Sequence, residues 1–140
     1  MRILGIDFGE KRIGLAISDP LGFTAQGLET LANTGIQNVI QALGHLCKEQ
    51  EVGEIVIGLP INMNGSLGPK AKEITEFVAA AKAALGVPIK TWDERLTSKQ
   101  AGRLMIEEGL SRQKQKMQSD RLAATLILQS YLESKRNEKI

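Results

Sequence analysis

The chain has 140 residues, of which 42% are apolar, and this is enough material for one domain with one core. Its 18 basic and 16 acidic side chains give a net charge of +2, which excludes a uniformly basic nucleic-acid coat protein. Aromatic residues make up only 4%, which argues against a single-strand binder that stacks bases on rings. We expect one domain over residues 1–140, with a frayed tail from about residue 135.

Residues 3–8 read as a buried strand, and the turn at Gly9 leads into a second strand over residues 12–18. Asp19 and Pro20 mark the next turn, and residues 23–31 are a plausible third strand. Three strands in succession with short turns predict an antiparallel meander.

The remainder of the chain alternates between helices and strands. Thr34 and Gln37 have capping-box spacing at the start of a helix, and residues 54–60 form a continuous apolar strand. Helical patterns then follow over residues 69–85, 97–109 and from about 117 onward, and residues 87–92 read as a last strand. The polar and basic stretch SRQKQK reads as a connector before the last helix.

This order predicts an α/β fold with a five-stranded mixed sheet and helices on both faces. The first three strands form the meander, and the two later strands run parallel to the first, because helical crossovers join them.

The only cysteine is Cys47 and the only histidine is His45, and this limits the available chemistry. No intrachain disulfide or cysteine-rich zinc site can form. The two residues are two positions apart on a predicted helix, so they point in different directions and do not suggest a nucleophile–base pair. An enzyme with this composition is expected to work through carboxylates.

No segment has the pattern of a targeting signal or a membrane span. Asp7 interrupts the apolar N-terminal stretch early, and no apolar run approaches the ~18 residues of a spanning helix. Together with the single free cysteine, this pattern favours a cytoplasmic protein without a membrane partner.

Asp7 stands inside the apolar run of the first strand, ILGIDFG. A carboxylate there costs several kcal/mol of desolvation unless it meets cations or hydrogen-bond donors. A structural salt bridge is one explanation. A metal or substrate site explains better why Gly9 follows so closely, since glycine lets another group approach the backbone.

Two further acidic positions complete a candidate site. Asp93 and Glu94 directly follow the strand over residues 87–92. Parallel strands direct their C-terminal ends toward the ligand-binding edge of a sheet. Asp120 lies near the start of the last helix, where an acid is also typical of an ordinary first turn. The pair at 93–94 likewise has a simpler explanation as an acidic cluster leading a helix.

Three convergent carboxylates would hold Mg²⁺ or Mn²⁺, which prefer oxygen ligands. Two such ions ~4 Å apart can activate a water molecule and stabilise the leaving oxygen of a phosphodiester.

Basic and amide side chains near these acids are candidates for contacts with nucleic acid. The predicted connector carries Arg112, Lys114 and Lys116 without any acid among them, and it could equally be a solvated linker. Asn62 and Asn64 follow the strand over residues 54–60, where a plain turn explains them equally well. The remaining candidates are Lys11, Arg12 and Arg95.

Four motifs, taken together in this order and spacing, resemble the YqgF/RuvX family of Holliday-junction-resolvase-like and pre-16S rRNA processing nucleases. They are GIDFGEKRIGLAISD at 5–19, IVIGLPINMNGSLGP at 55–69, WDERLTS at 92–98 and SDRLAATLILQSYL at 119–132. The resemblance covers nearly the whole chain and implies an RNase H-like fold.

The resemblance also implies a metal site made by Asp7, an acid of the DER motif and Asp120. Within that motif we choose Glu94, with Asp93 as the alternative. The resolvase relatives carry their second acid at the end of the fourth strand, whereas IVIGLP in this chain has none. The substitute acid would therefore come from a different strand.

The implied activity is that of a hydrolase acting on ester bonds, a nuclease that processes the 5′ end of pre-16S rRNA in ribosome biogenesis. The alternative is a Holliday-junction-type DNA resolvase, which would act on branched DNA as a symmetric homodimer.

Two other classes of function compete with the nuclease. DFGEKRIG resembles the phosphate-binding hairpin of actin-like and sugar-kinase ATPases, but one domain of this length supplies half of their cleft. A non-catalytic assembly factor that binds nucleic acid would keep the basic residues and could dispense with the acids.

Overall fold

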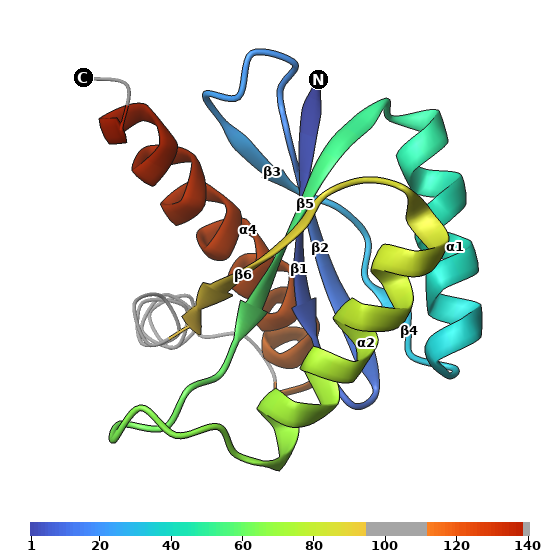
Figure 1. Cartoon of the computed structure of the whole chain (residues 1–140), viewed down its shortest axis with the longest axis vertical. Helices are drawn as coiled ribbons and strands as arrows, with labels where there is room; N and C mark the ends of the chain where they lie inside the picture. The colour runs from blue at the N-terminus through green and yellow to red at the C-terminus, as the bar shows by residue number, and fades with distance from the viewer. Residues whose placement is uncertain (95–111, 139–140) are drawn as a thin grey trace.

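The computed structural model describes residues 1–94 and 112–138, and it describes the side chains of residues 1–94 and 121–136. A mixed sheet lies between two helices on one face and a third on the other (Figure 1). The strand order is β3-β2-β1-β5-β6, with β4 pairing β2 off this path. The strands are β1 (Arg2–Phe8), β2 (Arg12–Ser18), β3 (Ala25–Gly27), β4 (Leu31–Ala32), β5 (Val52–Leu59) and β6 (Ile89–Asp93).

The directions of the strands agree with the prediction. β1 and β2 are antiparallel, whereas β1 pairs β5 and β5 pairs β6 in parallel. The single third strand expected over residues 23–31 is wrong in one respect, because it is divided into β3 and β4. The pairing register against β2 shifts by one residue between the Ala16–Gly27 and Ile13–Leu31 pairs, and this extra residue interrupts the ladder.

The helices are α1 (Ile36–Glu49), α2 (Pro69–Leu85) and α4 (Arg112–Glu138). α2 begins at Pro69 and ends before Gly86, whose φ of 69° is left-handed, as the sequence predicts. The capping box at Thr34 is wrong, because Gly35 is the N-cap of α1 and no side chain caps this end. Gly35 has a φ of 118°, a conformation that favours glycine.

α4 begins earlier than the sequence predicts. It begins at Arg112, so the expected basic connector is instead the first turns of this helix. It continues into the charged tail as far as Glu138, and the fraying expected from about residue 135 stays a prediction. The helix predicted over residues 97–109 lies outside the described residues.

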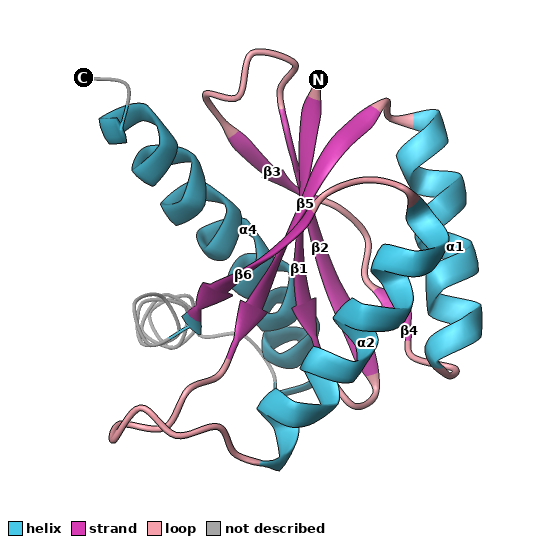
Figure 2. Cartoon of the chain, viewed as in Figure 1, coloured by secondary structure: helices cyan, strands magenta, loops and turns pink. Residues whose placement is uncertain are grey.

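Helices lie on both faces of the sheet (Figure 2), and each face has its own apolar cluster. α1 and α2 cover one face, which includes Leu4, Ile6 and Phe8 of β1. α4 covers the other face, which includes Ile3. Because strand side chains alternate, Asp7 belongs to the face under α4. Among the described helices, none is long and apolar enough to cross a membrane.

α4 lies unusually close to the sheet at two strand glycines. A Cβ atom at Gly5 would be 2.7 Å from the Cβ of Leu128 and 3.2 Å from the carbonyl oxygen of Ala124. A Cβ atom at Gly27 would overlap the side chain of Arg121, which also donates a hydrogen bond to the Leu28 carbonyl at 3.0 Å. These contacts fix the distance between the helix and the strands.

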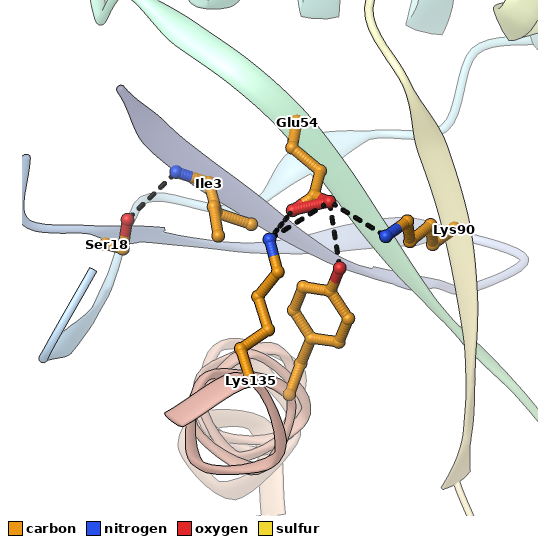
Figure 3. A network of polar contacts seen from close by, with 6 residues as sticks. Ile3, Ser18, Glu54, Lys90 and Lys135 are labelled. Carbon is orange, nitrogen blue, oxygen red and sulfur yellow. Dashed lines mark hydrogen bonds and ion pairs between the residues drawn. The ribbon is translucent and has the colours of Figure 1, made fainter. Parts of the chain in front are cut away.

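The C-terminal half of α4 is held by a carboxylate of β5 (Figure 3). Glu54 accepts a hydrogen bond from the Tyr131 hydroxyl at 2.8 Å and pairs with Lys135 at 2.8 Å and Lys90 at 3.5 Å. Burial tends to raise the pKa of Glu54, but the Lys135 and Tyr131 hydrogen bonds and the two lysine charges lower it below its usual 4.5. The Ser18 hydroxyl accepts a hydrogen bond from the Ile3 N–H at 2.8 Å, and the same figure marks this contact.

We predict that Glu54→Gln lowers the free energy of unfolding at pH 7 by about 1–2 kcal/mol, because hydrogen bonds to a charged group are removed. A carboxylate with a lowered folded pKa contributes stability above its unfolded pKa, and this is lost as pH falls through the folded value. Urea titrations of the variant should therefore show a flatter acid dependence below pH 4.5 than the wild type. The control is Glu73→Gln, at an exposed residue of α2, and equal effects of the two substitutions would contradict the prediction.

Candidate active site

Asp7 lies near the end of β1, on the face covered by α4, and its residue is half-buried. The turn after it depends on Gly9, because a Cβ atom there would overlap the carbonyl oxygen of Arg12. The group that approaches Gly9 is therefore the chain's own backbone, and the Asn33 amide also donates to the Gly9 carbonyl at 2.8 Å. This tight turn holds the end of β1 in a defined position.

Glu94 approaches Asp7 from β6. It directly follows Asp93, the last residue of that strand, and its side chain extends over Gly58 of the intervening strand β5. A Cβ atom at Gly58 would lie 2.7 Å from both the Cγ and the Oε1 of Glu94. From this position Glu94 makes a side-chain hydrogen bond with Asp7.

The two carboxyl groups compete for a proton. Burial, together with the hydrogen bond and the negative charge of Asp7, raises the pKa of Glu94 to about 8. The charge of Lys70 opposes it, whereas that of Asp93 raises the pKa further. Near neutral pH the pair therefore holds a proton that a cation could displace.

Of the two adjacent acids, Glu94 is the one whose side chain meets Asp7. Asp93 is the strand residue paired with Leu59, and it contributes a repulsive charge to Glu94. This geometry supports Glu94 over Asp93 as the ligand, and the assignment stays a prediction.

Asp120 belongs to α4, one helical turn before Ala124, which packs on Gly5. Its side chain lies outside the described part of the structure, so its role as a third ligand stays a prediction. Within the described residues, no group of three potential metal ligands is present.

The predicted contacts with nucleic acid fall into two groups. Arg112, Lys114 and Lys116 lie on the first turns of α4, not on a loop, and their side chains are not described. Arg95 lies outside the described residues.

The other predicted contacts lie near the edge of the sheet at which β1 and β5 end. Lys11 is exposed in the β1–β2 turn, and Arg12 begins β2. Asn64 accepts hydrogen bonds from the Ser66 N–H at 3.0 Å and hydroxyl at 2.6 Å, and the Asn62 amide donates to that hydroxyl at 3.1 Å. The two asparagines therefore shape the turn after β5, and their contact with substrate stays a prediction.

Lys70 is a residue that the sequence analysis missed. It occupies the first turn of α2, and its positive charge lowers the pKa of Glu94. The signal was available, because Pro69 predicts a helix start just beyond the C-terminal edge of β5. Its effect on Glu94 depends on how α2 lies against the sheet, which the sequence does not show.

Comparison with solved structures defines the class of fold. RuvC from T. thermophilus in complex with a Holliday junction substrate is similar over 98% of this chain and 96% of that chain, with a TM-score of 0.60 at 18% identity. The fowlpox virus resolvase is similar over 96% and 99%, with a TM-score of 0.61 at 17% identity. The chain has the RNase H-like resolvase fold.

Sequence comparison gives the family. The RuvX family, described as Holliday junction resolvase, matches residues 1–134. A protein of Syntrophomonas wolfei named "Putative pre-16S rRNA nuclease" is 52% identical over 95% of this chain and 94% of its own length. A protein of Clostridium acetobutylicum with the same name is 52% identical over 96% and 99%. The chain belongs to the RuvX/YqgF family.

The acid pair predicts an unusual pH dependence of stability. An acid whose folded pKa is raised binds more protons in the folded state, so stability falls as pH rises from the unfolded value of 4.5 to the folded value of about 8. In metal-free buffer with EDTA, we expect Asp7→Asn to reduce this fall, because the negative charge beside Glu94 is removed. Thermal unfolding at pH 5 and pH 8 measures it, and an undiminished fall in the variant would contradict the electrostatic coupling.

Proposed function

We propose that the protein is a metal-dependent nuclease that hydrolyses phosphodiester bonds of structured RNA and processes the 5′ end of pre-16S rRNA in the cytoplasm. The observation that carries this proposal is the hydrogen-bonded pair of Asp7 and Glu94 at one edge of an RNase H-like sheet. Two relatives that are 52% identical to this chain are named "Putative pre-16S rRNA nuclease", and this name supports the choice of substrate.

The residues present fit a divalent cation. Two carboxyl groups meet in a half-buried place where each disfavours the charge of the other, and a cation with oxygen preference would relieve this repulsion. We assign Asp7 and Glu94 as ligands of Mg²⁺ or Mn²⁺, with Asp120 as the third. When bound, such an ion supplies an activated water and stabilises a leaving oxygen.

The other polar residues then have separate tasks. Lys70 places a positive charge near Glu94, and this charge lowers the pKa of Glu94 against the larger effects of burial and Asp7. We expect Arg112, Lys114 and Lys116 to hold the phosphate backbone beside the acids, where they fix position and carry no sequence information. Lys11 and Arg12 extend this positive surface along the β1–β2 turn.

Cleavage of branched DNA is the second candidate, because the family is described as Holliday junction resolvase. Symmetric cuts in a four-way junction would call for a homodimer. Parallel assays with a 5′-extended 16S rRNA precursor and a synthetic four-way DNA junction separate the two substrates. Preferential cleavage of the junction by a dimer would overturn the RNA assignment.

The first functional prediction concerns the acid on β1. We expect Asp7→Asn to abolish Mn²⁺- or Mg²⁺-dependent cleavage of the RNA precursor while the protein remains folded, because the substitution removes one metal ligand and its negative charge. Cleavage is measured on labelled RNA, and folding by circular dichroism. Glu49→Gln, an exposed acid on α1, is the matched control and should cleave like the wild type.

Undiminished cleavage by Asp7→Asn would overturn the catalytic assignment. A wild-type protein that binds RNA without metal-dependent cleavage would favour the function of a non-catalytic assembly factor. A protein that ATP stabilises and that does not cleave RNA would favour the function of an ATP-binding module.

The second functional prediction concerns the basic start of α4. Replacing both Lys114 and Lys116 by glutamine should weaken RNA binding and reduce the slope of log K against log salt by about 1 for each phosphate that a lysine no longer neutralises. Filter binding at several salt concentrations measures the slope. The same double replacement at Lys48 and Lys82, exposed in the last turns of α1 and α2, is the control. An unchanged slope in the α4 variant would remove these lysines from the binding surface.

A further inference from the structure

The space above Gly58 is the feature that allows acids of β1 and β6 to meet across β5. One step beyond the paired residues Ile6 and Ile57, Gly58 lies beside Asp7 on the adjacent parallel strand. A Cβ atom at Gly58 would be 2.7 Å from both the Cγ and the Oε1 of Glu94. Real Cβ atoms essentially never approach heavy atoms so closely. A side chain at this position would therefore occupy the place that Glu94 now takes.

The backbone at Gly58 does not itself require glycine. The glycines with positive φ are Gly22, Gly35, Gly65 and Gly86 among the described residues, and Gly58 is not one of them. Glycine inside a strand weakens the strand and often marks a place where another group approaches closely. The neighbours of Gly58, and not its φ and ψ angles, therefore account for its lack of a side chain.

Two neighbours compete for this explanation. A Cβ atom at Gly58 would also lie 2.5 Å from the Cδ1 of Ile127 on α4. That atom is the terminal methyl of a flexible side chain, whereas the backbone contact of α4 falls on Gly5, opposite the Ala124 carbonyl. Glu94 differs from Ile127 because one of its overlapping atoms, Oε1, belongs to the carboxyl group that hydrogen-bonds Asp7.

We propose that Gly58 is a positioning residue for the metal site, which leaves the space through which Glu94 of the β6 end reaches Asp7 of β1. The proposal rests on the proposed nuclease function for its catalytic consequence. On this proposal, β5 has no side chain at position 58 because Glu94, from the end of β6, occupies that space when it reaches Asp7.

The test is Gly58→Ala in the full-length protein, with Gly53→Ala as the matched control. Both residues lie on β5, and the three heavy atoms nearest to a Cβ atom at Gly53 all belong to the side chain of the exposed Met1. We expect Gly58→Ala to remain folded and to weaken Mn²⁺ binding, followed by electron paramagnetic resonance, by about tenfold or more. With the RNA precursor, kcat should fall while KM is unchanged, and Gly53→Ala should match the wild type in both measurements.

A second substitution separates the two neighbours of Gly58. Ile127→Val removes the Cδ1 methyl, so Gly58→Ala combined with Ile127→Val relieves the overlap with α4 and leaves the overlap with Glu94. Persistent weak Mn²⁺ binding by the double variant supports the proposal. Restoration of wild-type binding would show that the effect acts through the helix, and would overturn it.

A third comparison uses Glu94→Ala as the background. If Gly58 acts through Glu94, adding Gly58→Ala to this background changes Mn²⁺ affinity no further. A further reduction as large as that in the wild-type background would overturn the proposal.

A crystal structure of Gly58→Ala decides the matter even if the wild type neither binds Mn²⁺ nor cleaves RNA, a result that would remove only the proposed nuclease function. Displacement of the Glu94 carboxyl from Asp7 supports the proposal. An unchanged Glu94–Asp7 contact would overturn it.

Discussion

The close approach of α4 to the strand backbone is the constraint on which the candidate site depends. At Gly5, the Leu128 side chain and the Ala124 carbonyl occupy the space where a Cβ atom would stand, so the helix rests directly on β1. Well-packed interiors transmit small displacements, because few voids are available to absorb them. A helix held this closely keeps the position of Asp120 fixed relative to the strand that carries Asp7.

The Glu54 contacts anchor the same helix farther along. Burying a carboxylate is costly, and two lysines and a tyrosine hydroxyl compensate for it here. Burial and the neighbouring Glu54 raise the pKa of Tyr131 to about 12, so its hydroxyl remains a donor across the physiological range. The two acidic places along α4 therefore differ in their chemistry, since the lysine and tyrosine contacts lower the pKa of Glu54, whereas burial and Asp7 raise the pKa of Glu94.

Strong local signals predicted the elements of the fold, but not their irregularities. Pro69 and Gly86 act through their own backbone preferences, and the bounds of α2 followed from them. The polar stretch at the start of α4 has no apolar period, so it reads as a loop, although Lys, Arg and Gln are good helix formers. The split between β3 and β4 comes from a one-residue register shift, and the sequence of a single strand does not contain that information.

The candidate site shows the same division between local and tertiary information. Asp7 could be identified from the sequence, because a charged residue in an apolar strand demands an explanation. The choice between Glu94 and Asp93 could be stated but not decided, since adjacent residues at a strand end differ only in where the chain turns. The sequence did not indicate Lys70 or Gly58, because the role of each depends on a neighbour on another element.

A site assembled across three strands has a consequence for how its acids can be arranged. β5 separates β1 from β6, so an acid on β6 can reach β1 only across the face of β5. Strands lie about 4.8 Å apart, so the side chains of Asp7 and Glu94 must together span two strand spacings. Glutamate has one more methylene than aspartate, and a bare backbone at Gly58 provides the shortest path. The residue type at 94 and the absence of a side chain at 58 are thus two parts of one geometric solution.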